Sequence, residues 1–206
     1  MAGIPIGKGT LLAPTPVVMV SCAAKGKAAN IITLAWAGTV CSEPPMLSIS
    51  VRPERYSHDI IAETGEFVVN LVNRDLLKAC DFCGVKSGRD MDKFAACSLT
   101  QEAVPVLNCA PAIAQSPLYM ACSVNKRLDL GTHTMFVADI IEVYVGTHLM
   151  DEKGKLDLHK ADLVAYSHGD YTALSEPIGF FGFSVASPAV LERRMPKSAK
   201  SSTKGK

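Results

Sequence analysis

The chain has 206 residues, of which 48% are hydrophobic and 20% are charged, and its formal net charge is +1. This length and composition favour a single domain with a sizeable core. The nearly balanced charge argues against a nucleic-acid-binding protein, which usually has a strong basic excess. No run of 18 apolar residues is present, so we expect no membrane-spanning helix and no membrane partner.

The chain has seven cysteines, an odd number, and they are scattered without the spacing of a disulfide framework. This pattern favours a reducing, cytoplasmic setting. Residues 11–22 have a weak likeness to an export signal, but Pro14 and Pro16 interrupt the apolar run and the segment alternates as a strand does. Residues 191–206 are basic and rich in Ser. We therefore predict one domain over residues 1–190, followed by a basic, disordered tail over residues 191–206.

Alternation of apolar and polar residues predicts a series of short strands. These predicted strands span residues 16–23, 29–37, 46–52, 66–72, 118–126 and 134–147. Short helices are predicted over residues 57–64, with Ser57 as N-cap and Gly65 as the stop, and over residues 75–82. The aromatic, glycine-rich segment 166–183 is expected to close over the sheet as a final connection. Many short strands and few helices indicate a closed antiparallel sheet.

The segment from Met46 to Arg52 has the clearest alternation in the chain. Its apolar face carries Leu47, Ile49 and Val51, whereas its other face carries Ser48, Ser50 and Arg52 beside Met46. A strand face with hydroxyls and a cation suits a polar ligand. The alternative interpretation is that this face simply meets solvent.

Four motifs occur in a fixed order along the chain. They are Asn30-x-x-Thr33-x-Ala35-Trp36-x-Gly38 followed by Pro44-Pro45 and Ser48-x-Ser50-x-Arg52; Cys83-Gly84-x-x-Ser87-Gly88-Arg89-Asp90-x-Asp92-Lys93-Phe94; Gly131-Thr132-His133; and Gly179-Phe180-Phe181-Gly182-Phe183-Ser184. Together they resemble the flavin reductase-like family, flavoredoxins included, from about Thr15 to Ser184. The resemblance implies a mainly β fold, the FMN-binding split β-barrel, which is a Greek-key-like antiparallel barrel with a few short helices.

FMN requires cations and N–H or O–H donors for its phosphate, a flat slot for its ring, and donors near the ring edge where negative charge builds on reduction. A helix that begins near Ser57 would direct free N–H groups at an anion. The resemblance implies that the elbow between the strand ending at Arg52 and the helix beginning near Ser57 holds the phosphate and ribityl chain, together with Ser87, Arg89 and Lys93. It also implies that the strand from Asn30 to Trp36 lines the ring. The residues assigned to the cofactor are Asn30, Ile31, Thr33, Ala35, Trp36, Ser48, Ser50, Val51, Arg52, Arg55, Tyr56, Ser57, His58, Cys83, Ser87, Arg89 and Lys93. For each there is an ordinary structural alternative, such as a surface charge for Arg55 and a core position for Trp36.

Two further features bear on the chemistry. The resemblance places His133 near the flavin and the nicotinamide, where it could steer a hydride donor or deliver a proton, although a lone histidine is more often structural. The Cys80-x-x-Cys83 pair has neither the second ligand pair that a zinc site needs nor the βαβ context of a thioredoxin-like centre. We therefore predict no metal site.

No Gly-x-Gly-x-x-Gly motif follows a strand, so NAD(P)H would have to dock beside the flavin as a transient reductant and then leave. The resemblance implies a cytoplasmic homodimer with each FMN near the subunit interface. Electrons would come from NAD(P)H or a redox-protein donor and pass to free flavin or a redox-protein acceptor. Two alternatives remain open: an FMN electron carrier fed by a protein partner, and a barrel that has lost FMN and only dimerises or binds another ligand.

Overall fold

The computed structural model describes residues 3–195, and the chain divides after Ala173 into two compact units. The first unit, residues 1–173, contains every strand found among the described residues. The second unit contains the short helices η3 (Phe183–Val185) and α4 (Pro188–Arg194). The predicted domain boundary at residue 190 lies inside α4, and residues 196–206 of the predicted tail lie outside the described residues.

The first unit is built on a seven-stranded sheet with the strand order β3-β2-β6-β9-β10-β5-β4. Its strands are β2 (Val18–Cys22), β3 (Asn30–Leu34), β4 (Ala37–Ser42), β5 (Pro45–Val51), β6 (Glu66–Leu71), β9 (Leu118–Asp129) and β10 (Thr134–Val145). Every neighbouring pair is antiparallel. Because β3 also contacts β5, which lies near the other end of this order, the sheet curls back toward itself. The structure is therefore mainly β, as predicted.

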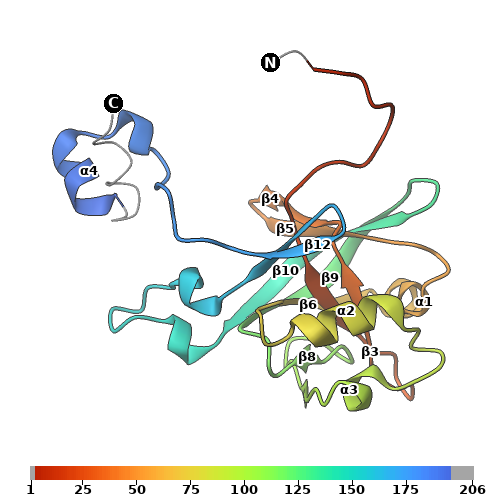
Figure 1. Cartoon of the computed structure of the whole chain (residues 1–206). Coiled ribbons are helices and arrows are strands. Elements are labelled where there is room, and N and C mark those ends of the chain that lie inside the picture. Colours follow the sequence, from red (N-terminus) through yellow and green to blue (C-terminus); the bar gives the residue numbers. More distant parts are fainter. Residues whose placement is uncertain (1–2, 196–206) are drawn as a thin grey trace. The chain divides into compact units, whose positions relative to one another are not determined.

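Smaller elements surround this sheet (Figure 1). A three-stranded sheet has the order β1-β11-β12, and β7 pairs with β8. The remaining elements of the first unit are β1 (Thr15–Pro16), α1 (Tyr56–Thr64), α2 (Leu77–Val85), α3 (Lys93–Ala96), β7 (Gln101–Glu102), β8 (Ala112–Ile113), η1 (Thr147–Leu149), η2 (Leu158–Ala161), β11 (Val164–Ser167) and β12 (Asp170–Ala173).

Two buried clusters fix the position of the helices. Inside the curl, side chains of β2, β5, β6 and β10, among them Val20, Ile49 and Phe136, pack with Ile60 and Ile61 of α1. On the other face of β2 and β3, Met19 and Ile31 pack against α2 and α3. Because β2 and β3 bury apolar residues on both faces, α1 and α2 are held on opposite sides of β3.

The structure corrects two details of the sequence prediction. The single strand expected over residues 29–37 ends at Leu34, and β4 begins at Ala37. The interruption lies at Ala35 and Trp36, where the Trp36 carbonyl accepts a hydrogen bond from the Ser50 N–H of β5 at 3.0 Å. Helix α1 begins one residue earlier than expected, with Arg55 in place of Ser57 as its N-cap, whereas the predicted stop at Gly65 is confirmed by its φ of 69°.

Candidate functional site

Two adjoining pockets lie where β3 ends, between the β5–α1 elbow and α2. The larger has a volume of about 360 Å³ and is lined by Val17, Ile32, Thr33, Leu34, Ala35, Trp36, Ser50, Arg52, Arg55, Asp81, Gly84, Val85, His133, Tyr166 and Tyr171. The smaller has a volume of about 180 Å³ and is lined by Asn30, Ile32, Glu54, Arg55, Tyr56, Ser57, Cys83, Gly84, Lys86, Ser87, Gly88, Arg89 and Lys93. They share Ile32, Arg55 and Gly84, so one elongated ligand can occupy both.

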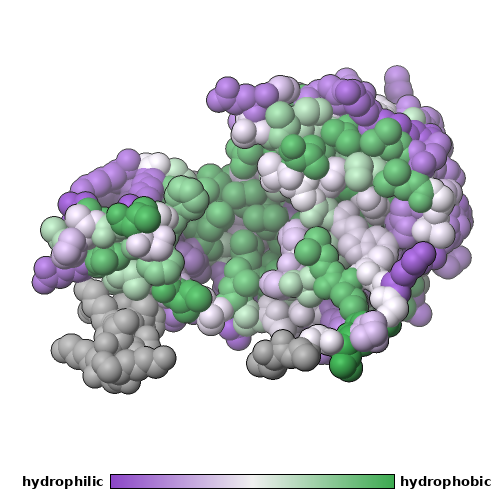
Figure 2. Space-filling view, turned by 90° about the horizontal axis from the view of Figure 1, so that it is seen from above, coloured by the Kyte–Doolittle hydropathy of each residue, from purple (hydrophilic) through white to green (hydrophobic). Residues whose placement is uncertain are grey.

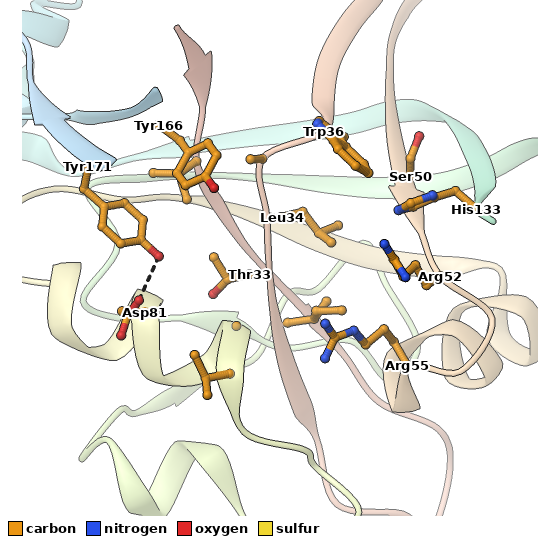
Figure 3. A pocket seen from close by; sticks show the side chains of 15 residues that line it. Thr33, Leu34, Trp36, Ser50, Arg52, Arg55, Asp81, His133, Tyr166 and Tyr171 are labelled. Atoms are coloured by element: carbon orange, nitrogen blue, oxygen red, sulfur yellow. Dashed lines mark hydrogen bonds between the residues drawn. The ribbon is translucent and has the colours of Figure 1, made fainter. Parts of the chain in front are cut away.

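The larger pocket has two chemically different ends (Figure 3). Arg52 and Arg55 lie with His133 on the side of β5 and the α1 elbow, while Asp81 lies with two tyrosines on the side of α2 and β11–β12. The rest of the lining is apolar or uncharged and includes Leu34, Ala35 and Trp36. A flat, mostly apolar ring with polar edges fits this distribution.

His133 stands just before β10 and packs directly against Trp36 at one end of the larger pocket (Figure 3). The centroids of the two rings are 4.6 Å apart in an edge-to-face arrangement, and the His133 Nδ1 lies 2.9 Å from the Thr132 hydroxyl. Partial burial, with the positive charge of Arg52, lowers the pKa of His133. A neutral imidazole with one ring nitrogen already engaged can accept or donate one hydrogen bond at Nε2.

The opposite end of the larger pocket is fixed by a contact between distant segments. The Tyr171 hydroxyl of β12 donates to Asp81 of α2 at 3.1 Å, and the Tyr166 ring packs edge-on against Tyr171. Burial, reinforced by the hydrogen bond to Asp81, raises the pKa of Tyr171. The phenol therefore stays protonated at neutral pH.

The smaller pocket has the chemistry of an anion site. The first N–H groups of α1, at Tyr56 and Ser57, have no partner within the helix. The Arg89 guanidinium lies over the Tyr56 ring at 5.4 Å and donates to the Glu54 carbonyl at 2.8 Å. Helix N-termini and guanidinium groups both favour negative charge.

Glycine is required at one position of this pocket. A Cβ placed on Gly88 would overlap the Asn30 side chain and approach the Tyr56 Cδ1 at 2.9 Å. The loop backbone therefore passes against β3 and α1 more closely than any other residue would allow.

Lys93, the first residue of α3, connects the end of α2 to β3. Its side chain is only 3% exposed, and its Nζ donates to the carbonyls of Ile31 and Cys83, each at 2.8 Å. Burial lowers the pKa of Lys93. An ammonium has three donors, so one remains for a ligand in the smaller pocket.

Two side-chain hydrogen bonds fix β3 at the pockets. The Asn30 amide donates to the Ser57 hydroxyl at 2.8 Å, which joins β3 to α1. The Thr33 hydroxyl donates to the Cys80 carbonyl, which joins β3 to α2. Ser57 therefore serves as an acceptor for β3, and the N-cap residue of α1, Arg55, makes no side-chain cap hydrogen bond.

Most of the predicted cofactor residues come together here, but four do not line either pocket. Ile31 and Val51 are fully buried in the core, and Ile31 offers only its carbonyl, to Lys93. Ser48 lies within the ladder, opposite Gly38 and Val137. His58 is a buried residue of α1, and its ring nitrogens contact the Asp59 carboxylate and the Thr134 hydroxyl.

Sequence reasoning missed the far wall of the larger pocket and part of the smaller one. The missed lining residues are Val17, Ile32, Leu34, Glu54, Asp81, Gly84, Val85, Lys86, Gly88, Tyr166 and Tyr171. Gly84 and Gly88 stood inside a recognised motif, so their glycine identity was an available signal. The aromatic segment 166–183 was expected to close over the sheet, but nothing in it marked Tyr166 or Tyr171 as pocket residues. They lie in β11 and β12, which are placed by the pairing of β11 with β1 and β12.

All seven cysteines are free thiols. Burial raises the pKa of Cys83 to about 12 and that of Cys80 to about 11, so neither is a thiolate at neutral pH. Among residues 3–195, no three His, Cys, Asp or Glu side chains form a group that could hold a metal ion. In the same described range, no helix is long and apolar enough to cross a membrane.

The chain belongs to the flavin reductase-like family, because the model of the flavin reductase like domain matches residues 11–175. The predicted family is thereby confirmed, and the structural likeness given below confirms the predicted split β-barrel.

The flavoredoxin of Desulfovibrio vulgaris (Miyazaki F) is among the most similar solved structures. It is 28% identical, with a TM-score of 0.82 over 88% of this chain and 98% of that one. A high molecular weight rubredoxin of Moorella thermoacetica is 29% identical over 52% of this chain and 45% of its own length. The reductase component of a 4-nitrophenol 4-monooxygenase/4-nitrocatechol 2-monooxygenase from Rhodococcus opacus is 27% identical over 56% of this chain and 58% of its own length.

Proposed function

We propose that this protein is an FMN-dependent oxidoreductase, with the FMN phosphate in the smaller pocket and the ring in the larger one. The observation that carries this proposal is that a pocket lined by cations and helix N–H groups adjoins a larger, mostly apolar pocket, the two sharing Ile32, Arg55 and Gly84. In the proposed reaction, electrons pass from NAD(P)H to a free flavin or a redox-protein acceptor. The family and the named reductase component support this reaction.

The residues present fit the phosphate. Arg55 and Arg89 supply positive charge, the N–H groups at the beginning of α1 supply donors, and Ser87 supplies a hydroxyl. Lys93 adds its remaining donor from below. The absence of a Cβ at Gly88 brings the loop backbone close to this space.

When bound, FMN would supply a two-electron redox centre between a hydride donor and an acceptor. Arg52 and Arg55 would stabilise the negative charge that accompanies reduction, since both lie on one edge of the larger pocket. His133, with its lowered pKa, would hold or move a proton at Nε2 on the open side of the slot. Trp36, 45% exposed, leaves that side accessible to a transient nicotinamide.

The relative named as a rubredoxin favours a second candidate function. In this alternative, the protein keeps FMN permanently and carries electrons to or from a redox-protein partner, with little NAD(P)H oxidation. In the third case, a barrel without FMN, the two pockets would serve another anionic ligand.

The test is an absorption spectrum of the purified protein, followed by anaerobic mixing with NADH and with NADPH. Flavin bands that bleach rapidly with either nucleotide support the reductase. Bands that persist with both nucleotides but bleach with dithionite support the electron carrier. A protein that remains colourless after incubation with FMN and gel filtration contradicts the FMN proposal.

We further propose a cytoplasmic homodimer with each FMN site near the subunit interface. Apolar side chains gather in patches on the face seen in Figure 2. Exposed apolar residues of the first unit include Trp36, Val40, Leu128 and Leu130, and such patches mark interaction surfaces.

The seven free thiols support a reducing compartment. Light scattering at micromolar concentration tests the dimer, and cell fractionation tests the location.

A further inference from the structure

His58 is a buried polar residue that neither pocket uses. It is 6% exposed, and its ring lies edge-on to Phe136 with the centroids 5.5 Å apart. Its Nδ1 lies 3.2 Å from an Asp59 carboxylate oxygen, and its Nε2 lies 3.1 Å from the Thr134 hydroxyl. The imidazole therefore connects α1 to the beginning of β10.

Both of these contacts lead toward the proposed flavin site. Thr134 follows His133 in the sequence. Its hydroxyl donates to the Asp129 carboxylate at 3.0 Å across the base of the β9–β10 hairpin. The other Asp59 oxygen lies 3.6 Å from Arg89, which lines the smaller pocket. A chain of polar contacts thus joins the hairpin that carries His133 to the loop that carries Arg89.

Counting protons shows which state of His58 satisfies this chain. The Thr134 hydroxyl has one proton, and donating it to Asp129 leaves Nε2 of His58 to donate to the Thr134 oxygen. The Asp59 carboxylate is an acceptor, so Nδ1 must also carry a proton. Either neutral tautomer loses one of the three hydrogen bonds, and only the imidazolium makes all of them.

We propose that His58 is a positioning residue that acts as an imidazolium, holding Thr134 and Asp59 and, through them, both ends of the flavin site. The charged groups that face it are Asp59 on its own helix and Asp129 beyond Thr134. Arg89 pairs with Asp59, and Arg127 lies 3.5 Å from Asp129. Loss of the His58 proton removes a positive charge beside Asp59 and breaks one link in the chain.

The consequence for ligand binding rests on the proposed function. With His58 neutral, the Asp59 carboxylate is less well compensated and opposes an anion in the smaller pocket. The affinity of the protein for FMN should therefore fall about two- to fivefold as the pH rises from about 5 to 8, the range in which histidine side chains in general change charge.

The first test needs no flavin. Nitrogen-15 NMR of the imidazole in the flavin-free protein should show protons on both ring nitrogens of His58 at the acidic end of the range. His58→Gln assigns the signal. A His58 that carries one proton at every pH from about 5 to 8 overturns the proposal.

The second test measures the dissociation constant of FMN across the same pH range for the wild type, His58→Gln, Thr134→Val and Thr134→Ser. The phosphate of FMN itself ionises at about pH 6, so the dissociation constant of each variant is divided by that of the wild type at the same pH. We expect this ratio to fall with pH for His58→Gln and Thr134→Val, and to stay constant for Thr134→Ser and for the exposed control His159→Gln.

A constant ratio for His58→Gln contradicts the proposal, because a merely structural role weakens binding equally at every pH. Riboflavin, which lacks the phosphate, should show a smaller pH effect. If FMN binds at no pH, the proposed function fails, while the NMR measurement still decides the state of His58.

Discussion

Gly88 shows how a single missing side chain shapes the site. Gly88→Ala places a Cβ where Asn30 and Tyr56 already lie, so the loop must move away from the smaller pocket. We expect FMN binding to weaken more than about tenfold, which corresponds to about 1.4 kcal/mol. Fluorescence titration measures this, with Gly38→Ala as the control because a Cβ there meets nothing within 4 Å. Equal affinities for the two variants would contradict the role of Gly88.

The charges near His133 give a second test at the residue scale. Burial contributes most to its lowered pKa, Arg52 lowers it further, and Glu54 opposes Arg52. Arg52→Gln should therefore raise the pKa of His133, and Glu54→Gln should lower it. Proton NMR titration of the two variants measures both shifts. Shifts of the same sign would show that these charges do not act on the ring.

At the scale of elements, the site depends on how β3 is held against α2. Thr33 donates a hydrogen bond to the Cys80 carbonyl, and a Cβ on Gly84 would lie 3.2 Å from the Thr33 Cβ. Thr33→Val keeps the shape but loses the donor, so we expect a loss of about 1 kcal/mol in the free energy of unfolding. Urea denaturation measures it, with the exposed Thr39→Val as the control, for which a change within about 0.5 kcal/mol is expected. No difference between the variants would leave Thr33 without a structural role.

At the scale of the whole molecule, Glu66 ties the sheet to the loop over residues 108–110. Its carboxylate accepts hydrogen bonds from the N–H groups of Asn108 and Ala110, each at 2.9 Å, and of Cys109. Burial alone would raise its pKa, but these donors outweigh burial, and the pKa of Glu66 lies below its ordinary value. The resulting stabilisation is complete above the unfolded-state pKa of about 4.3 and is lost as pH falls through the lower folded-state value.

Glu66→Gln should therefore destabilise the protein by about 2 kcal/mol at neutral pH. The difference from wild type should shrink as the pH falls below about 4. Urea denaturation over this pH range measures both effects. Glu63→Gln is the matched control, because Glu63 pairs with Lys27 at the exposed surface and should change stability little. A constant difference at all pH values would contradict this account.

The sequence by itself determined the character of the fold and the polar half of the site. The period of two in β5 and the glycine after α1 are local properties, set by side-chain direction and by backbone freedom, so they can be read from consecutive residues. The motif from Cys83 to Phe94 likewise identified the loop of the smaller pocket, because its cations and glycines are adjacent in the chain.

Only the tertiary structure decided the rest. Tyr171 and Asp81, 90 residues apart, form the far wall of the larger pocket because β12 pairs beside β11. The bend at Trp36 depends on a hydrogen bond from β5, and the burial of His58 depends on its contact with β10. These features arise from contacts between distant segments, which a local pattern of polarity does not specify.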